Sequence, residues 1–283
     1  LEVGPSLRLT RLGLDASTPL WIAVLGRDAV RAYGVGGLGR TLTLDRTTPD
    51  VDRREGTHIR LGLDGRLTST GVPLAEAGAD LLVYRAPATT LLGRPVQLSA
   101  RAEVRGLLAP RDVPWPERLF LGGASDFRGF RTAQVGVYDA VCAGSPFVGF
   151  DPDGEFDRFY IPRGGRARAL VGGEVELQHL GFQELSGALF AEAGWLDTAG
   201  VRGTVGAGVR YATGLGPFRF DVSLRPLAPE DLGPGLGGPG EMYGCEALLP
   251  RRRAFDLLSE IQRYEPLGRR PALNVFITVG RPF

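Results

Sequence analysis

The sequence predicts an all-β fold, an antiparallel transmembrane β-barrel of which 11 or 12 strands are visible, with two long extracellular loops. Apolar and polar residues alternate over repeated segments of about ten residues, the length at which a tilted strand crosses a bilayer. Glycine is abundant, with 42 of 283 residues, which favours turns over helices. Short turns at one side and two long segments at the other are typical of outer-membrane barrels.

The N-terminal half contains the less regular strands. Segment 57–68 places Ile59 and Leu61 on one face and Arg60 on the other, so that one face suits lipid and the other suits water. Segment 95–107 alternates in the same way, with its apolar residues at even positions and its polar residues at odd positions. Further strands are expected at 5–14, 18–27, 37–46 and 80–87.

The C-terminal half alternates more clearly. Strands are expected at 166–178, 184–195, 201–211, 218–225 and 271–283. In the fourth of these, Phe218 and Phe220 alternate with Arg219, which gives two faces of opposite polarity. The outward residues predicted for the closing strand are Leu273, Val275, Ile277, Val279 and Phe283. An even number of strands would suit a closed wall, because closure leaves no unpaired edge in lipid.

The whole chain, 1–283, is interpreted as one barrel domain interrupted by long segments at 108–165 and 228–270. Strand counting places both long segments on the outer side. The second contains a possible short helix within 251–264, because apolar residues recur there at helical spacing. Cys142 and Cys245 fall in the two segments, and they either form a disulfide that joins the loops or are two unpaired cysteines.

The alternative fold is a soluble antiparallel barrel or sandwich, whose strands also alternate. The balance of 33 basic and 32 acidic residues is compatible with either fold. Long strands that carry Gly, Ala and Val on one face argue against a large dry core and favour the membrane barrel. The chain begins at Leu1 without a signal peptide, so it is expected to be a processed or excised piece of a longer protein.

Residues 116–130 carry the signal for a family. Here Phe120-Leu121-Gly122-Gly123 precedes Phe127-Arg128-Gly129-Phe130, and this stretch resembles the sixth extracellular loop of the BamA/TamA-like outer-membrane assembly superfamily, a bacterial surface antigen family. The first position of the tetrapeptide departs from the family's Val but stays apolar. Matching segments follow in the family's order at 164–177, 190–194, 206–221 and the strand that ends at Phe283.

The resemblance implies a barrel of 16 strands, so either the first four or five strands were removed with the N-terminus or this chain is a smaller relative. The family's periplasmic domains would be missing from this chain. It also implies that the long loop 108–165 folds into the lumen and that Arg128 contacts acidic residues of the wall, here Glu192 and Glu176. Alternation along the strands independently places both glutamates on the polar face. Without the resemblance, Arg128 would be interpreted as a solvated loop arginine and Glu192 as an ordinary lumen charge.

The function implied by the resemblance is the assembly or insertion of proteins into the bacterial outer membrane by strand exchange at the seam between first and last strands. Its partners would be unfolded outer-membrane proteins and the lipid bilayer, with no cofactor, metal or nucleic acid. The alternative is a polypeptide-translocating pore, as in two-partner secretion or a passenger-fused barrel. Such a pore would favour anions, because one polar face carries an excess of arginines: Arg60, Arg66, Arg101, Arg105, Arg166, Arg168, Arg202, Arg210, Arg219 and Arg225.

Enzymatic activity is not expected. The chain has only two histidines, His58 and His179. Alternation places His58 on the polar face but distant in sequence from any suggestive serine, and His179 lies near a strand end. The run Gly34–Gly39 matches a dinucleotide-binding pattern literally, but a strand-like segment follows where a helix is required, so we interpret it as a glycine-rich turn. Because the chain contains no lysine, a Walker-type phosphate loop is excluded.

Overall fold

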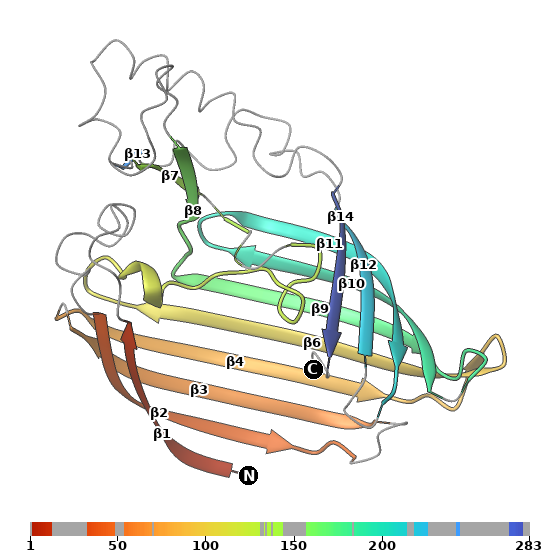
Figure 1. Cartoon of the computed structure of the whole chain (residues 1–283). Helices are drawn as coiled ribbons and strands as arrows, with labels where there is room; N and C mark the ends of the chain where they lie inside the picture. Colours follow the sequence, from red (N-terminus) through yellow and green to blue (C-terminus); the bar gives the residue numbers. More distant parts are fainter. Residues whose placement is uncertain are drawn as a thin grey trace.

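The computed structural model shows an almost entirely β structure (Figure 1). It describes residues 2–12, 33–48, 54–69, 71–130, 133, 135–136, 138–143, 157–182, 184–213, 218–225, 242–243 and 272–279. The elements are β1 (Glu2–Leu12), β2 (Tyr33–Asp45), β3 (Gly56–Thr68), β4 (Pro73–Arg85), β5 (Thr90–Leu91), β6 (Arg94–Leu108), η1 (Trp115–Glu117), β7 (Tyr138–Ala143), β8 (Asp157–Pro162), β9 (Ala167–Leu177), β10 (Leu185–Leu196), β11 (Gly200–Tyr211), β12 (Phe218–Arg225), β13 (Met242–Tyr243) and β14 (Ala272–Val279). No helix in these ranges is long and apolar enough to span a bilayer.

One large curved sheet contains most of the strands in the order β1-β2-β3-β4-β6-β9-β10-β11-β12-β14, with β5 added to β6. All of its neighbours are antiparallel, which confirms the predicted all-β antiparallel fold. Within the described ranges β1 pairs with β2 and β14 pairs with β12, so the first and last strands form the two ends of the sheet. A second, small sheet has the order β13-β7-β8.

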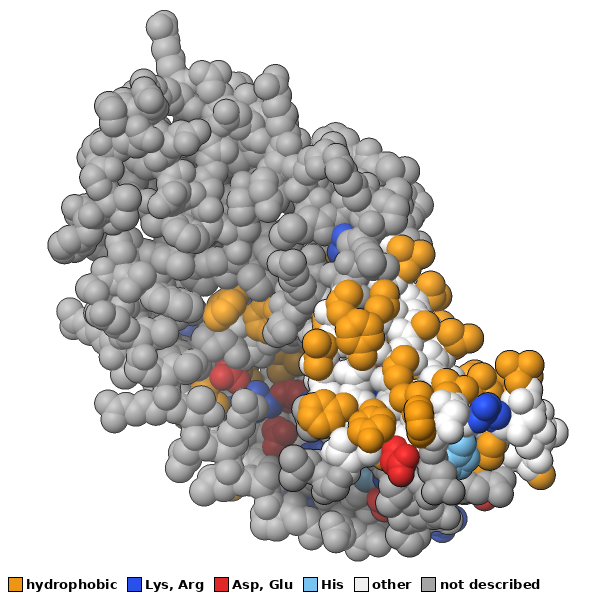
Figure 2. Space-filling model, turned by 45° about the vertical axis from the view of Figure 1, so that its right-hand side comes forward, with side chains coloured by type: hydrophobic (Ala, Val, Ile, Leu, Met, Phe, Trp, Pro, Cys, Tyr) orange, Lys and Arg blue, Asp and Glu red, His pale blue; other side chains and the backbone are white. Residues whose placement is uncertain are grey.

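The two faces of the large sheet have opposite polarity, as the alternation predicts. In β12, Phe220 is 45% exposed whereas its neighbour Arg219 is only 3% exposed. In β10, Leu189 is 65% exposed whereas Glu192 is 5% exposed. Figure 2 shows hydrophobic side chains gathered over the described part of the face that it presents. This inside-out distribution contradicts a soluble sheet with a dry core, because a soluble protein would bury the phenylalanines and expose the arginines.

The connections lie at the predicted ends of the sheet. The turns that follow β4, β9 and β11 share one end, because Leu98 pairs with Arg85 and Val175, while Leu185 pairs with Tyr211. Both long segments leave from the opposite end, after β6 and after β12. The register thus places both long segments at one end of the sheet, where the short turns between β3 and β4 and between β10 and β11 also lie.

Several expected boundaries need correction. The strand expected at 80–87 begins at Pro73, and the long segment 108–165 contains β7 and β8 rather than a continuous loop. The glycine run Gly34–Gly39 is part of β2 and not a turn. A Cβ atom at Gly37 would lie 2.8 Å from Cγ of Arg66 in β3, so glycine here makes room for that arginine.

Other expectations fall wholly or partly outside the described residues. The strand expected at 18–27 and the helix expected within 251–264 both lie outside them. In the closing strand, Val275 and Ile277 are exposed as predicted. Leu273 and Val279 belong to β14 by their backbone, but their side chains are not described, and Phe283 lies outside the described residues.

The small sheet bears on the expected disulfide. β13 pairs in parallel with β7 and places Tyr243 opposite Val141, the residue before Cys142. Cys245 itself lies outside the described residues, but it follows Tyr243 by two positions in the sequence. We expect peptide mapping without reduction to recover Cys142 and Cys245 in one linked peptide, because Cys142 directly follows the residue that pairs with Tyr243 and an oxidising compartment would allow the two cysteines to pair. Recovery of both thiols in the free state would contradict the disulfide.

Candidate functional site

The segment after β6 folds back along the inner face of the sheet and presents a compact turn to it (Figure 1). Gly122 N donates to Asp126 Oδ2 at 3.0 Å, and Gly123 N donates to the carbonyl oxygen of Phe130 at 3.0 Å. These bonds close the loop around the tetrapeptide that begins at Phe127. Gly129 has a φ of +104°, a conformation that favours glycine. The local sequence therefore fixes the turn that carries Arg128.

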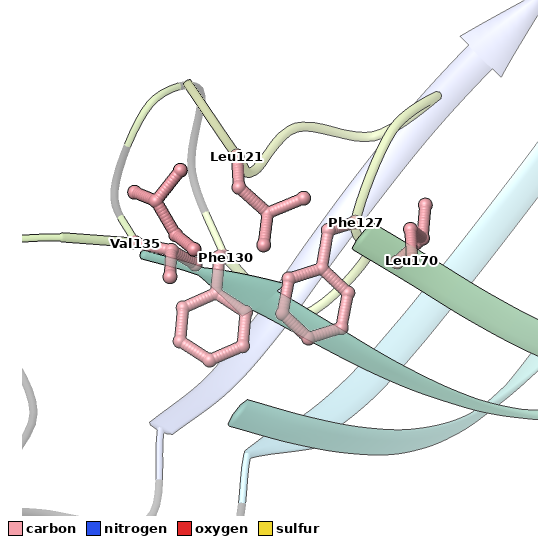
Figure 3. Packing of buried hydrophobic residues seen from close by; sticks show 6 residues of the cluster. Leu121, Phe127, Phe130, Val135 and Leu170 are labelled. Atoms are coloured by element: carbon pink, nitrogen blue, oxygen red, sulfur yellow. The ribbon is translucent and has the colours of Figure 1, made fainter. Parts of the chain in front are cut away.

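Apolar side chains anchor this turn against the wall. Leu121, Phe127, Phe130, Val135, Leu170 and Leu196 form one buried cluster, and Figure 3 shows the two phenylalanines beside Leu121 and Leu170. The rings of Phe127 and Phe130 stack at 4.7 Å between centroids. A Cβ atom at Gly194 would lie 2.7 Å from Leu121 Cδ2 and 3.1 Å from Phe127 Cε1. Gly194, the last residue of the segment 190–194, therefore leaves space for Phe127 to pack on β10.

Arg128 and Glu192 are joined by both backbone and side chain. Glu192 Oε2 accepts a hydrogen bond from the backbone N–H of Arg128 at 2.8 Å, and Oε1 accepts one from Nε at 2.8 Å. Arg128 Nη2 lies within ion-pair distance of Oε1, at 2.7 Å. Both side chains are almost completely buried, with 1% exposure for Arg128 and none for the glutamate. Such charge-assisted bidentate contacts fix orientation as well as distance. The structure therefore places together the two residues that the sequence expected to meet.

The second acidic partner of Arg128 is Glu174, which replaces the expected Glu176. Arg128 Nη1 donates to Glu174 Oε2 at 2.6 Å. Its guanidinium lies 3.6 Å above the Phe190 ring, and Phe190 is directly opposite Glu174 in the register. Glu176 is one inward position further along β9, opposite Ala188, and so further from Glu192. Stacking on Phe190 decides which glutamate the arginine contacts.

The Arg128 pair belongs to a larger buried charge cluster. Arg210 Nη1 donates to Asp221 Oδ1 at 2.5 Å, and Arg210 Nη2 donates to Glu174 Oε1 at 3.1 Å. Arg219 Nη2 lies 3.3 Å from Asp221 Oδ2. Arg101 Nη2 lies 3.1 Å from Glu192 Oε1. We define the inner charge cluster as Arg101, Arg128, Glu174, Glu192, Arg210, Arg219 and Asp221.

The inner charge cluster links the loop to five strands, from β6 through β9, β10 and β11 to β12. It has four cations and three anions, so each carboxylate is shared between two or more arginines. Buried charges are tolerated only when they are paired and hydrogen-bonded. Loss of one member therefore disturbs several strands at once.

A second attachment, which the sequence analysis missed, lies earlier in the loop. Arg66 Nη1 of β3 donates to Glu117 Oε2 of η1 at 2.8 Å, and Arg66 also contacts Glu76 of β4. Val113 packs in a separate buried cluster with Val72 of the turn between β3 and β4, Leu74 of β4 and Leu107 of β6. The loop is thus held on both halves of the sheet. In the sequence, this attachment is signalled only by the acidic residue Glu117 before the motif. An acidic residue alone does not identify Arg66, 51 positions away, as its partner.

Ion pairing also changes the interpretation of the arginine-rich face. Seven of the ten arginines counted from the sequence lie within ion-pair distance of a carboxylate: Arg66, Arg101, Arg105, Arg166, Arg168, Arg210 and Arg219. A paired arginine contributes little net field to a pore. The count of basic residues is therefore not sufficient to predict an anion preference. The two histidines lie apart, with His58 Nδ1 3.1 Å from Asp45 Oδ2 and His179 in the turn after β9.

A curved antiparallel sheet with an apolar exposed face, an ionised inner face and a loop folded against that inner face is the architecture of a transmembrane β-barrel. Comparison with known families identifies the kind of barrel. Residues 84–231, just over half of the chain, match the model of the Omp85 superfamily domain. The chain belongs to the Omp85 superfamily, which confirms the resemblance seen in its loop motif.

Solved structures are similar in fold. BamA from Haemophilus ducreyi, in a form lacking POTRA domains 1–3, has a TM-score of 0.53 and 15% identity, covering 69% of this chain and 39% of that chain. CdiB from Acinetobacter baumannii has a TM-score of 0.44 and 17% identity, covering 70% of this chain and 31% of that chain. The chain therefore spans well under half the length of either structure. The search of curated proteins found no match.

Proposed function

We propose that this chain forms the bacterial outer-membrane barrel of a protein that folds or inserts other outer-membrane proteins by exchanging strands at its seam. The arrangement of β14 supports this proposal, because in the described residues its one antiparallel neighbour is β12. The other edge of β14 offers amide donors and carbonyl acceptors to an incoming strand. Membership of the Omp85 superfamily and the BamA-like fold support the same class of activity.

The proposed activity requires no catalytic residue, cofactor or nucleotide. Strand exchange replaces one ladder of backbone hydrogen bonds by another, so its free-energy change is small. The barrel contributes by presenting an unpaired strand edge to the incoming strand. The exposed residues Val275 and Ile277 keep the outer surface of β14 apolar. Thr278 and Phe276, on the opposite face, are uncharged, so an incoming strand meets no charged side chain at these two positions, although Phe276 is bulky.

The inner charge cluster gives the loop a positioning role in this proposal. Arg128 and the apolar cluster around Phe127 hold the loop against the inner face between β6 and β12. The loop therefore occupies space on the inner side of the sheet. This favours an assembly role over the alternative, a polypeptide-translocating pore, because such a pore needs a passage through the inside of the barrel. In the pore alternative the loop would have to leave the inner face during transport.

A folding assay with an unfolded outer-membrane barrel distinguishes the two functions. Vesicles that contain this chain should accelerate client folding at least about tenfold over lipid alone, equivalent to about 1.4 kcal/mol of barrier. Folding is followed by the shift of the client band on unheated gels. A peptide with the sequence of residues 271–283 should inhibit by occupying the seam, and a scrambled peptide of equal composition should not.

The contrary result would be no acceleration together with polypeptide-dependent current block in planar bilayers. That outcome would favour the translocation pore. Acceleration that the two peptides inhibit equally would contradict strand exchange at the seam, because non-specific competition for the client would then explain the effect.

A further inference from the structure

Two turns project side by side at the end of the sheet away from the long segments. One is the β5–β6 hairpin, and the other joins β9 to β10. They belong to neighbouring strands, since Val96 of β6 pairs with Leu177 of β9. Gln178 N also donates to the carbonyl oxygen of Pro95 at 3.0 Å, which extends the ladder beyond the last paired residues. Figure 1 shows both turns reaching beyond the wall at the same edge.

The tips of these turns carry large apolar side chains. Leu92 is 85% exposed, Phe182 is 70% exposed, and Leu91 is also exposed. Leu91 pairs with Arg94, which leaves Leu92 and Gly93 as a two-residue hairpin turn with φ values of +54° and +72°. Asn, Asp and Gly are the residues that suit positive φ at both central positions. A leucine here is costly to the hairpin and gains nothing from burial, so its presence points to a contact outside the chain.

The apolar surface of the turns continues that of the wall. Leu98 of β6 and Val175 of β9 are opposite each other on the exposed face and lie next to the two turns. Figure 2 shows hydrophobic side chains continuing along the presented face towards its right-hand end. The turns are therefore joined to the surface that faces lipid in a transmembrane barrel.

We propose that Leu91, Leu92 and Phe182 form a membrane-surface anchor, here called the apolar crest, that inserts into the phospholipid headgroup layer at this end of the barrel. This inference rests on the proposed outer-membrane location. β6 has 15 residues. At about 3.4 Å per residue and a tilt of about 40°, such a strand spans about 39 Å along the membrane normal, which is more than the hydrocarbon core of about 30 Å and less than the full bilayer of about 40–45 Å. The hairpin tip therefore reaches headgroup depth.

The charges around the apolar crest suit a phospholipid surface. Arg85 is exposed and pairs in register with the outward Leu98, and Arg94 pairs with Leu91 of the crest. Both arginines lie where they can meet lipid phosphates, while Glu184 in the neighbouring turn is the exposed acidic group there. Apolar tips flanked by cations are typical of segments that bind at a membrane interface.

Spin labels test the depth of the apolar crest in the folded full chain. In a background with Cys142→Ser and Cys245→Ser, single cysteines are introduced as Leu92→Cys and Phe182→Cys. Leu189→Cys on the exposed face of β10 and Asp112→Cys in the long segment are the controls. The chain is refolded in phosphatidylethanolamine and phosphatidylglycerol vesicles, and the access of oxygen and of a water-soluble nickel chelate to each label is measured. The crest labels should fall between the two controls.

The controls separate the failure of this inference from failure of the outer-membrane proposal. If the crest labels are as accessible to nickel as the Asp112→Cys label while the Leu189→Cys label is protected, membrane insertion of the apolar crest is contradicted but the membrane location of the barrel is not. A protein partner would then be the better explanation for the exposed crest. Nickel access at the Leu189→Cys label would contradict the membrane location itself. Leu92→Asn provides a second readout: because Asn suits positive φ, it should keep stability in detergent yet fold severalfold less efficiently into vesicles. Unchanged folding into vesicles would overturn the anchor.

Discussion

Replacement of Arg128 by Met should destabilise the folded chain by about 3–5 kcal/mol, because removing one partner of a buried ion pair leaves the other charge uncompensated. Glu192 bears most of this loss. Its side chain has no exposure, and among the described residues Arg101, at 3.1 Å, is the other arginine within ion-pair distance of it. Glu174 still has Arg210 and Arg219. Urea unfolding in vesicles, followed by the band shift on unheated gels, measures the change.

A double-mutant cycle isolates the pair from general damage. Glu192→Gln in the Arg128→Met background should recover part of the stability, with a coupling energy of at least about 1.5 kcal/mol. Arg202→Met is the control: this arginine lies on β11, outside the inner charge cluster, and donates to the adjacent carbonyl oxygen of Val201 in an exposed hydrogen bond, so its loss should cost well under half of what Arg128→Met costs. Additive effects of the two substitutions would contradict the role given to the Arg128–Glu192 contact.

The large sheet could be predicted from the sequence because its signal is local. A strand such as β12 alternates Phe, Arg, Phe and Asp, and a period of two identifies both the strand and its faces. Glu192 could also be assigned to the inner face by counting positions along β10. The boundaries were less predictable at β4, where Ala, Glu, Ala and Gly give weak contrast between faces.

The choice between Glu174 and Glu176 could not be made from the sequence. Both lie on the same face of β9, and alternation treats them as equivalent. The difference arises from the register with β10, which puts Phe190 beside Glu174 and gives the guanidinium of Arg128 a ring on which to stack. The Glu117–Arg66 attachment is non-local in the same way, since it depends on how the loop crosses from β6 to β3. Contacts across a barrel depend on register and curvature, which composition does not encode locally.

Gly129→Ala should be the most damaging of the glycine substitutions in the loop motif, with an expected loss of about 3 kcal/mol or more, because backbone strain adds to overpacking. Its φ of +104° lies in a region that residues with a Cβ atom rarely adopt. The added methyl group would also lie 2.7 Å from Cβ of Thr204, a buried residue of β11. The loop must then withdraw, which pulls Arg128 away from Glu192.

Gly106→Ala provides the control for Gly129→Ala. Gly106 lies in β6, no atom would be within 4 Å of an added Cβ, and its φ is not in the positive region, so this substitution should leave stability unchanged within about 0.5 kcal/mol. Limited proteolysis of the folded chain in vesicles reports the loop directly: Gly129→Ala should expose the segment around Phe127 to cleavage, and Gly106→Ala should not. Equal protection of the two variants would mean that the loop tolerates a side chain against β11, and the close packing of the motif would then not be what holds Arg128 in place.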